Sequence, residues 1–188
     1  MTFDIMRVIA GSARSMPLKT PKGMDTRPTT DRIKETLFNM LQGYIPDGIF
    51  IDVCSGTGGI GIEALSRGAS HAYFIDHDPA CIQCIKDNLH FTKLEDKATV
   101  LKQDAYSALN LIHEKSADVV FADPPYEAGL EPGLLSVLSR MPYVTEDTVI
   151  VIEALIDTDF SFASDSGFDI LKEKCYKTNK HVWLRRQI

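Results

Sequence analysis

Short apolar runs alternate with longer amphipathic segments between residues 49 and 154, and this alternation restricts the chain to few folds. The runs have the length of strands, and the segments between them have helical periodicity. The predicted strands are Ile49–Val53, Ala72–Ile75, Ala98–Leu101, Val119–Ala122 and Val149–Glu153, and the predicted helices are Ile60–Arg67, Pro79–Phe91, Ala105–His113 and Leu130–Leu138. Repeated β-α units predict an α/β fold with helices on both faces of a mostly parallel sheet.

The pattern changes near the end of the chain. Two strand-like runs, Phe168–Tyr176 and His181–Arg186, are separated by four residues, which leaves no room for a helix. They must therefore pair as an antiparallel hairpin. Residues 48–188 are predicted to form a Rossmann-like domain, whose seven-stranded sheet ends in this hairpin.

Residues 1–47 are predicted to form an extension before the sheet. Strand-like stretches run from Ile5 to Lys19, and prolines and a glycine then mark a loop. A helix should begin after Thr29 or Thr30, because either hydroxyl can cap its first turn. The apolar face of this helix, which should pack on the main core, consists of Ile33, Leu37, Met40 and Leu41.

Charge is distributed unevenly along the chain. The net charge is −6, which argues against a strong general affinity for nucleic acid. Residues 5–34, however, carry seven basic and two acidic side chains, so their net charge is +5 and the rest of the chain carries −11. A basic arm on an acidic body can bind a polyanion at one place only, although an ordinary solvated surface would show the same asymmetry. The candidate nucleic-acid contacts are Arg7, Arg14, Arg27 and Arg32.

A glycine-rich turn, DVCSGTGGIG at residues 52–61, follows the first strand of the α/β pattern and begins its first helix. Gly56, Gly58 and Gly61 match the spacing G-x-G-x-x-G, and Asp76 ends the next strand 20 positions after Gly56. Such glycines let the backbone turn tightly and approach a ligand closely. Taken alone, this spacing would suit a dinucleotide site.

Asp52 distinguishes between two possible ligands of this turn. It lies at the carboxyl end of the first strand, where its carboxylate would repel a bound pyrophosphate. S-adenosylmethionine has no phosphate and carries an ammonium and a sulfonium, which a carboxylate attracts. Asp76 can accept hydrogen bonds from ribose hydroxyls, and Asp104, after the third strand, from an adenine amino group. The candidate cofactor-binding residues are therefore Asp52, Gly56, Gly58, Asp76 and Asp104.

Two of these acids have an alternative role. Asp104 could be only the N-cap of the following helix, and Asp76 could be only a turn residue. Both alternatives stay open at the level of sequence.

The segment Asp123-Pro124-Pro125-Tyr126 follows an apolar strand, at the sheet edge where open α/β folds bind ligands. The prolines fix φ and remove N–H donors, so the loop presents carbonyl oxygens in a rigid frame. The amine of a nucleobase is a poor nucleophile because its lone pair is delocalised into the ring. The Asp123 carboxylate and the Pro124 carbonyl can grip its two N–H bonds and free the lone pair, while Tyr126 stacks on the base. These four residues are the candidate catalytic residues.

The carboxylate at position 123 favours guanine. Guanine offers N1–H and N2–H side by side, and a carboxylate can accept from both. Adenine offers N6–H beside the N1 acceptor, where an asparagine amide would fit better.

With these motifs, the sequence resembles a known family, the bacterial 16S rRNA (guanine-N2)-methyltransferases of the RsmD type. The resemblance rests on residues 26–39 (TRPTTDRIKETLFN), on residues 52–68 (DVCSGTGGIGIEALSRG), on the 123–126 loop, and on Tyr176 with the hairpin after it. It implies a Rossmann-like class I fold, the cofactor S-adenosylmethionine, and a guanine in 16S rRNA of the assembling small subunit as substrate. Arg27 and Arg32 would approach RNA or cofactor.

The sequence departs from this family at two positions. Cys54 stands where aromatic residues are usual, and Lys177 replaces the small residue often found after the tyrosine. Cys54 would reshape the wall of the cofactor pocket slightly.

Other activities are compatible with the same motifs. Loops of related enzymes methylate adenine N6 in nucleic acid or a protein glutamine amide. A dinucleotide-binding oxidoreductase and an inactive RNA-binding module are further alternatives.

The Cys81-x-x-Cys84 spacing has no second ligand pair, so no metal is expected. The five histidines are dispersed and are expected to need no function. No apolar run approaches the roughly 20 residues of a membrane helix, and scattered cysteines without a signal peptide predict a cytoplasmic protein.

Overall fold

The computed structural model describes residues 6–21, 30–126 and 128–188. Its helices are α1 (Asp31–Leu41), α2 (Gly59–Ser66), α3 (Pro79–Thr92), the 3-10 helix η1 (Glu95–Lys97), α4 (Ala105–Leu109), α5 (Glu131–Leu138) and α6 (Phe162–Asp165). Its strands are β1 (Ile49–Val53), β2 (His71–Asp76), β3 (Ala98–Lys102), β4 (Val119–Ala122), β5 (Val149–Leu155), β6 (Phe168–Cys175) and β7 (Asn179–Arg186).

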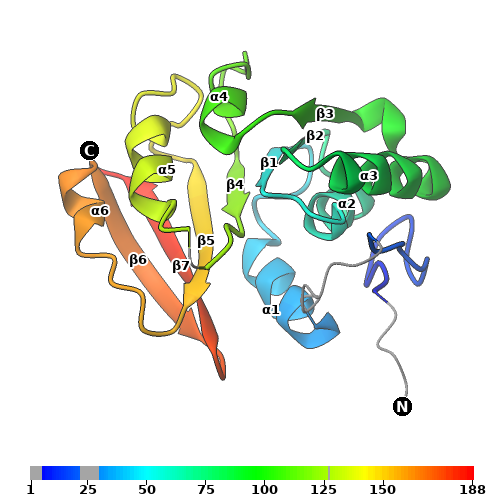
Figure 1. Ribbon diagram of the computed structural model, residues 1–188, viewed down its shortest axis with the longest axis horizontal. Coiled ribbons are helices and arrows are strands. Elements are labelled where there is room, and N and C mark those ends of the chain that lie inside the picture. Colours follow the sequence, from blue (N-terminus) through cyan, green and yellow to red (C-terminus); the bar gives the residue numbers. More distant parts are fainter. Residues whose placement is uncertain (1–5, 22–29, 127) are drawn as a thin grey trace.

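The strands form one seven-stranded sheet in the order β3-β2-β1-β4-β5-β7-β6 (Figure 1). Strands β1 to β5 are mutually parallel, and β7 is antiparallel to both of its neighbours, β5 and β6. The predicted α/β fold and the predicted terminal hairpin are therefore confirmed. The turn of the hairpin is closed by the Tyr176 N–H, which donates to the Asn179 carbonyl at 2.8 Å.

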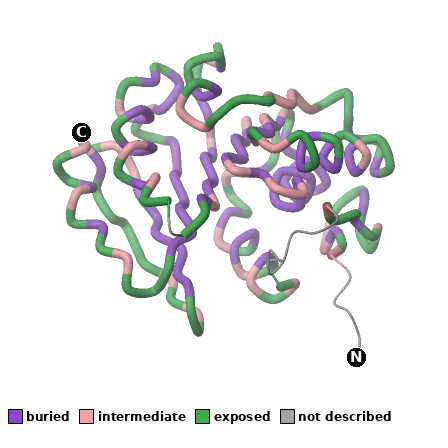
Figure 2. The backbone as a smooth tube through the Cα atoms, in the orientation of Figure 1, coloured by how far each residue is buried: buried purple, intermediate pink, exposed green. Residues whose placement is uncertain are grey.

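Two hydrophobic clusters cover the two faces of the sheet, because successive strand residues point to opposite sides. Ile51 and Val120 belong to the cluster beneath α4, α5 and α6. Phe50 and Phe121, their direct neighbours in sequence, belong to the cluster that contains side chains of α1, α2 and α3. Figure 2 shows the central strands β1, β4, β5 and β7 mostly buried, whereas the edge strand β6 is largely exposed.

The N-terminal helix α1 begins where predicted. Thr30 is its N-cap, and its hydroxyl oxygen accepts from the Ile33 N–H at 3.4 Å. Leu37 and Leu41 are buried in the second cluster together with Phe38, so the predicted apolar face packs on the core. Thr29, the alternative cap, lies outside the described residues.

The strands predicted between Ile5 and Lys19 are wrong for the part of this segment that the structure describes. Residues 6–19 form an irregular loop with a single bridge between Arg7 and Pro17. The backbone reverses at Gly11 (φ 85°) and Ser15 (φ 67°). Some hydrogen bonds stay within the loop, such as that from the Val8 N–H to the Met16 carbonyl at 3.0 Å, whereas the N–H groups of Ile9, Ala10 and Ala13 donate to side chains of helix α2. Its apolar residues Val8, Ala13 and Leu18 still reach the second cluster.

Two smaller differences concern helices. The helix predicted over Ala105–His113 ends at Leu109, where the Asn110 side chain donates to the Tyr106 carbonyl at 2.8 Å. Helix α6, a single turn, has no counterpart in the sequence prediction. The boundary between extension and domain at residue 47 stays a prediction.

Candidate active site at the carboxyl edge of the sheet

Three predicted site segments meet where the strand order reverses. β1 lies between β2 and β4, so the loops that leave β1 and β4 diverge at this point, which is where open α/β sheets bind ligands. Asp52 precedes the last residue of β1, Asp76 ends β2, and Asp123 follows β4 directly. The Asp123 N–H donates to the Val53 carbonyl at 3.2 Å, which joins the two loops.

The glycine turn has left-handed backbone at three positions, Cys54 (φ 59°), Gly56 (φ 54°) and Gly58 (φ 76°). Ser55 holds this turn against β2, because its N–H donates to the Ile75 carbonyl at 2.9 Å and its hydroxyl accepts from the Ile75 N–H at 2.9 Å. At Gly61 a Cβ would lie 2.4 Å from a Phe74 ring carbon, so only glycine lets α2 approach β2 this closely. The glycines thus serve both the turn and the packing.

Asp52 is buried, with 2% of its surface exposed, and points back toward α2. Its Oδ2 accepts from the Gly61 N–H at 2.9 Å. Burial raises the pKa of this carboxyl to about 7, against the Gly61 hydrogen bond, which lowers it, and with a smaller contribution from the charge of Asp76. The hydrogen bond from Gly61 therefore does not fully offset the cost of burying an ionised Asp52, and a cationic ligand nearby would stabilise the ionised form.

Asp76 and Asp104 both have backbone partners. The Asp76 carboxylate accepts from the N–H groups of Gly56 and Asp78, each at 2.9 Å. Asp104 is the N-cap of α4, and its Oδ1 accepts from the Ser107 N–H at 3.0 Å. Hydrogen bonds from the Ser107 side chain and then from its backbone N–H lower the pKa of Asp104. Asp104 is thus an N-cap, and Asp76 holds the glycine turn and the turn after β2 through its hydrogen bonds. A role of either acid in cofactor binding stays a prediction.

Cys54 lies among the three acids of the reversal point. Burial, followed by the charges of Asp76, Asp123 and Asp52, raises the pKa of its thiol to about 12. The carboxyl groups that act on this position carry negative charge when ionised, with no cationic side chain among them. Such surroundings suit a ligand with a sulfonium and an ammonium, and they oppose a pyrophosphate.

The loop after β4 is compact. Pro124 is buried and Pro125 is exposed, and the Ala128 N–H donates to the Pro125 carbonyl at 2.9 Å. Burial, then the charges of Glu153 and Asp52, raise the pKa of Asp123 well above that of an ordinary carboxyl group. Asp123 is therefore a stronger base than a surface aspartate.

Tyr126 is held by its hydroxyl while 41% of its surface stays exposed. The hydroxyl donates to Oε1 of Glu153 at 2.9 Å. Sequence reasoning did not single out Glu153, nor Asn179 and His181, which bond to the same carboxylate. A signal was present, because Glu153 interrupts an otherwise apolar central strand, and a buried carboxylate requires partners.

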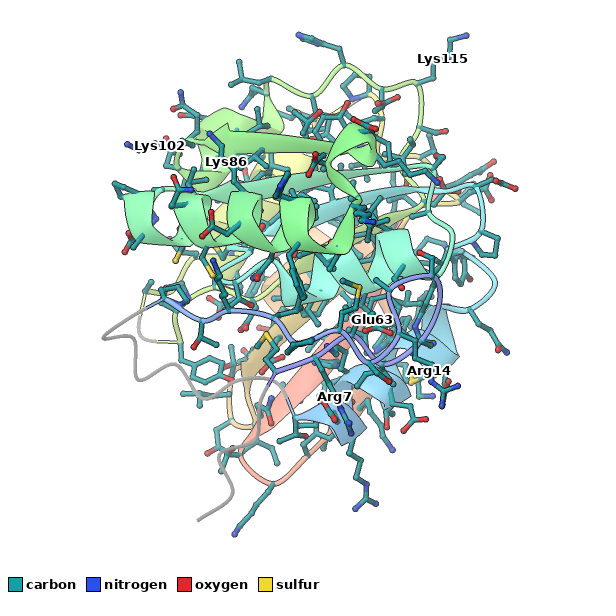
Figure 3. The ribbon with its side chains drawn as sticks, turned by 90° about the vertical axis from the view of Figure 1, so that its right-hand side faces the viewer. Arg7, Arg14, Glu63, Lys86, Lys102 and Lys115 are labelled. Carbon is teal, nitrogen blue, oxygen red and sulfur yellow. The ribbon has the colours of Figure 1, made fainter. Side chains whose placement is uncertain are left out.

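Of the predicted nucleic-acid contacts, Arg7, Arg14 and Arg32 lie among the described residues. Arg7 and Arg14 are exposed and line a shallow cavity of about 180 Å³, although Arg7 also pairs with Asp31 at 2.9 Å. Figure 3 shows both arginines on the side of the molecule that carries the N-terminal segment. Arg32 is exposed on α1. Arg27 lies outside the described residues.

The basic arm is less basic than its sequence suggests. Lys34 was counted among its charges, but only 2% of its surface is exposed, and its Nζ lies 3.5 Å from Oε2 of the buried Glu63. Burial lowers the pKa of Lys34, against the charge of Glu63, which raises it. Lys34 therefore neutralises an internal carboxylate and does not face a polyanion.

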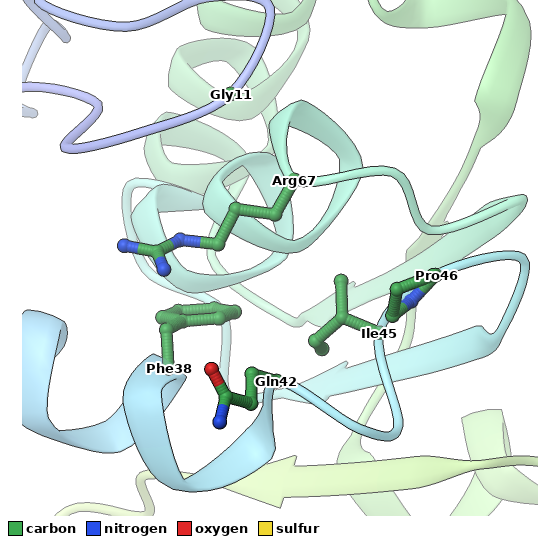
Figure 4. A pocket seen from close by; sticks show the side chains of 6 residues that line it. All are labelled: Gly11, Phe38, Gln42, Ile45, Pro46 and Arg67. Carbon is green, nitrogen blue, oxygen red and sulfur yellow. The ribbon is translucent and has the colours of Figure 1, made fainter.

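A larger cavity, of about 260 Å³, lies away from the reversal point (Figure 4). It is bordered by Phe38 of α1, by Gln42 just after this helix, and by Arg67 just after α2, at the end opposite to the glycine turn. The Arg67 guanidinium lies over the Phe38 ring, 5.0 Å from its centre. In the described parts of the chain, no helix is long and apolar enough to cross a membrane, and no group of three His, Cys, Asp or Glu side chains could hold a metal ion.

The strand order, the glycine turn at its reversal point and the Asp-Pro-Pro-Tyr loop together define the Rossmann-like class I methyltransferase fold. The family model described as "Conserved hypothetical protein 95" matches residues 6–185. The chain belongs to this family, the RsmD family to which its motifs point.

Individual relatives agree with this assignment. A Bacillus subtilis protein provisionally described as an rRNA methyltransferase is 41% identical over 150 residues, which cover 79% of this chain and 82% of that protein. Ribosomal RNA small subunit methyltransferase D of Haemophilus influenzae is 34% identical, over 90% and 88% of the two chains. A solved structure, provisionally described as an Escherichia coli methyltransferase, has a TM-score of 0.81 and 31% identity, and the match covers 97% and 98% of the chains.

Proposed function

We propose that this chain transfers a methyl group from S-adenosylmethionine to the N2 amine of a guanine in 16S ribosomal RNA, within the assembling small subunit in the cytoplasm. The observation that carries the proposal is the position of the Asp123 loop directly beside the anionic glycine turn, at the reversal point of the sheet. Methyltransferase relatives imply a donor of the S-adenosylmethionine type, and the relatives named as ribosomal RNA methyltransferases support RNA as the substrate.

The residues at the reversal point fit this cofactor. Asp52 and Asp76 bring carboxylates to the glycine turn. Gly56 leaves the surface of the turn open, since a Cβ there would meet nothing within 4 Å, whereas Gly58 faces Ile85 and Phe74 and lets the turn pack closely. Asp104, exposed at the start of α4, is available at the next strand end for an adenine amino group. When bound, S-adenosylmethionine supplies an electrophilic methyl group.

The Asp123 loop would hold the acceptor. The Asp123 carboxylate accepts from N1–H and from one N2–H of guanine, and the Pro124 carbonyl accepts from the other N2–H. This grip frees the nitrogen lone pair for in-line attack, and catalysis rests mainly on positioning and electrostatics. Asp123, with its raised pKa, is suited to accept the proton that the methylated amine loses. The exposed ring of Tyr126 stacks on the base.

Replacement of Asp76 by alanine tests the cofactor site. We expect the affinity for S-adenosylmethionine to fall by about 1.5–3 kcal/mol, the usual value of a hydrogen bond to a charged group. Asp78→Ala is the matched control, because it removes a neighbouring carboxylate that only caps α3, accepting from the Ala80 N–H at 2.7 Å. Isothermal calorimetry with S-adenosylmethionine, its demethylated product and NADH provides the measurement. Tight NADH binding without an S-adenosylmethionine signal would refute the cofactor assignment.

The choice of substrate is tested by initial rates on assembled small subunits and on protein-free 16S RNA at equal salt. The described arm offers few exposed cations and the body is acidic, so affinity for naked RNA should be weak. A guanine must also be unpaired or flipped out to reach Asp123. We therefore expect faster methylation of the assembled particle. A clear preference for free RNA, for DNA or for a protein amide would contradict the proposal.

Charge reversal at Arg14 or Arg32 tests the RNA contacts in the same assay. Each variant should lower kcat/KM several-fold and reduce the salt dependence by about one phosphate contact. Lys115→Glu is the control, because Lys115 is equally exposed but lies far from Arg7 and Arg14 in Figure 3. Equal effects of all three reversals would show that only overall charge matters.

A further inference from the structure

A buried polar cluster lies beneath the loop that carries Tyr126. It consists of Glu153 on β5, Asn179 and His181 on β7, and the two tyrosines Tyr126 and Tyr176. Glu153 and His181 are direct partners in the β5–β7 register, and Asn179 is two residues from His181, so all three side chains point to the same face of the sheet. All three are buried.

Both oxygens of the Glu153 carboxylate are engaged. Oε1 accepts from the Tyr126 hydroxyl at 2.9 Å and from Asn179 Nδ2 at 2.6 Å, and Oε2 lies 3.0 Å from His181 Nε2. The other ring nitrogen of His181 is 3.3 Å from the Tyr176 hydroxyl. The rings of Phe121 and Tyr176 meet the imidazole edge-on, so its orientation is fixed by packing as well as by hydrogen bonds.

The sheet does not require this cluster. An apolar pair of similar volume at Glu153 and His181 would join β5 to β7 at least as well, because burying charged groups has a large desolvation cost. What an apolar pair could not do is hold the Tyr126 hydroxyl. Tyr126 lies 27 positions before Glu153 and is the only member of the cluster that lies on the base-binding loop.

We propose that Glu153, fixed by Asn179 and His181, is a positioning residue that orients the Tyr126 ring and the Asp123 loop for methyl transfer. The C-terminal hairpin is then part of the active site, although none of its three cluster residues touches the base. This inference rests on the proposed function, because it assigns Tyr126 to the base-binding surface.

The charge of Glu153 also acts on Asp123. The hydrogen bonds and the charge of His181, with the bonds from Tyr126 and Asn179, hold the pKa of Glu153 below its usual value in spite of burial. Glu153 therefore stays ionised, and together with Asp52 it raises the pKa of Asp123. Among the described residues, the titratable groups that interact with Asp123 are Asp52 on β1, Cys54 just after it, Glu153 on β5 and Tyr126 on its own loop.

The sign of the pH effect follows. The grip on the amine requires ionised Asp123, so the rate should fall as the pH drops through its raised pKa. Removing the charge of Glu153 lowers that pKa, so the acidic limb of the kcat/KM profile moves to lower pH. A residue with a purely structural role would leave this limb in place.

Two variants test the proposal, Glu153→Gln and Tyr126→Phe. The glutamine amide still accepts from Tyr126, so Glu153→Gln should keep most of kcat and shift the acidic limb downward. Tyr126→Phe keeps the ring but loses its anchor, and we expect kcat to fall roughly tenfold, as for one lost hydrogen bond to a charged acceptor, with cofactor affinity unchanged. Tyr143→Phe is the matched control, because it removes a buried hydroxyl that donates to the Leu109 carbonyl at 2.8 Å, remote from the site.

Hydrogen exchange supplies a measurement that does not depend on activity. The Ala128 amide, which donates to Pro125, should exchange faster in Tyr126→Phe than in the native protein or in Tyr143→Phe. If exchange, kcat and the acidic limb were the same as in the native protein for both test variants, the positioning role would be refuted. If the native protein methylated no small subunits but Ala128 exchange still responded, the proposed substrate would be wrong and the anchoring of the loop would stand.

Discussion

Replacing Asp123 by alanine should nearly abolish methyl transfer, by at least ~10²–10³-fold, while the affinity for S-adenosylmethionine changes only a few-fold. The carboxylate is the acceptor that would hold the target amine, and alanine leaves no group to replace it. The backbone N–H of Asp123 donates to the Val53 carbonyl, and alanine retains that hydrogen bond. Single-turnover assays with saturating cofactor, together with calorimetry, separate the loss of chemistry from the loss of binding.

Two further variants sharpen this test. Asp123→Asn offers one acceptor in place of two, so guanine methylation should fall strongly even though size and shape are preserved. Asp157→Ala removes an exposed carboxylate from the loop after β5 and should leave the rate unchanged. Near-normal turnover of Asp123→Ala would show that the amine is not gripped as proposed.

Replacement of Glu63 by alanine should destabilise the fold by about 3–5 kcal/mol, which for a chain of this length lowers Tm by roughly 6–20 °C. Glu63 is fully buried on α2 and accepts from the N–H groups of Ile9 (2.7 Å) and Ala10 (3.0 Å). It also pairs with Lys34 and, at 2.7 Å, with Arg67. Figure 3 shows Glu63 beside the N-terminal segment. Alanine would leave the Lys34 ammonium buried without its counter-charge and two amides without acceptors.

Two variants serve as controls for Glu63→Ala: one removes the acid of an exposed ion pair, and the other removes the buried lysine that pairs with Glu63. Asp87→Ala breaks an exposed pair with Lys19 and should change the Tm very little. Lys34→Met should cost less than Glu63→Ala, because Glu63 keeps Arg67 and two backbone donors. Thermal unfolding of the three variants decides the point, and equal losses in Asp87→Ala and Glu63→Ala would contradict it.

The sequence was a good guide wherever hydrophobic periodicity determines the structure. β1 occupies the predicted Ile49–Val53, because its apolar residues fill both faces of a central strand. The hairpin was predictable from the length of its connection alone. The prediction of strands in the N-terminal segment was wrong for a physical reason. Its apolar residues do reach the core, but the N–H groups of Ile9 and Ala13 donate to the side chains of Glu63 and Ser66, which lie more than 50 positions away in the sequence.

The candidate site shows the same limit. Motifs identified Asp52, Asp76 and Asp123, and the structure brings these acids around Cys54. The sequence could not predict that Asp52 and Asp76 bond to backbone amides of the glycine turn, because those bonds depend on the exact path of that turn. The sequence did not predict the Glu153–His181 pair. To predict a pair across two antiparallel strands one must know their register, and a single sequence does not give the register.

The position of β7 has a consequence for synthesis. β7 is made after β5 and β6, yet it lies between them in the sheet. Until it leaves the ribosomal tunnel, β5 and β6 each expose an edge with unsatisfied hydrogen-bonding groups, and such edges promote pairing with other chains. Glu153 also lacks Asn179 and His181 at that stage, so the Tyr126 loop, the proposed base-binding loop, would lack its proposed anchor. Activity would thus arise in one late step of folding, when the last strand is inserted.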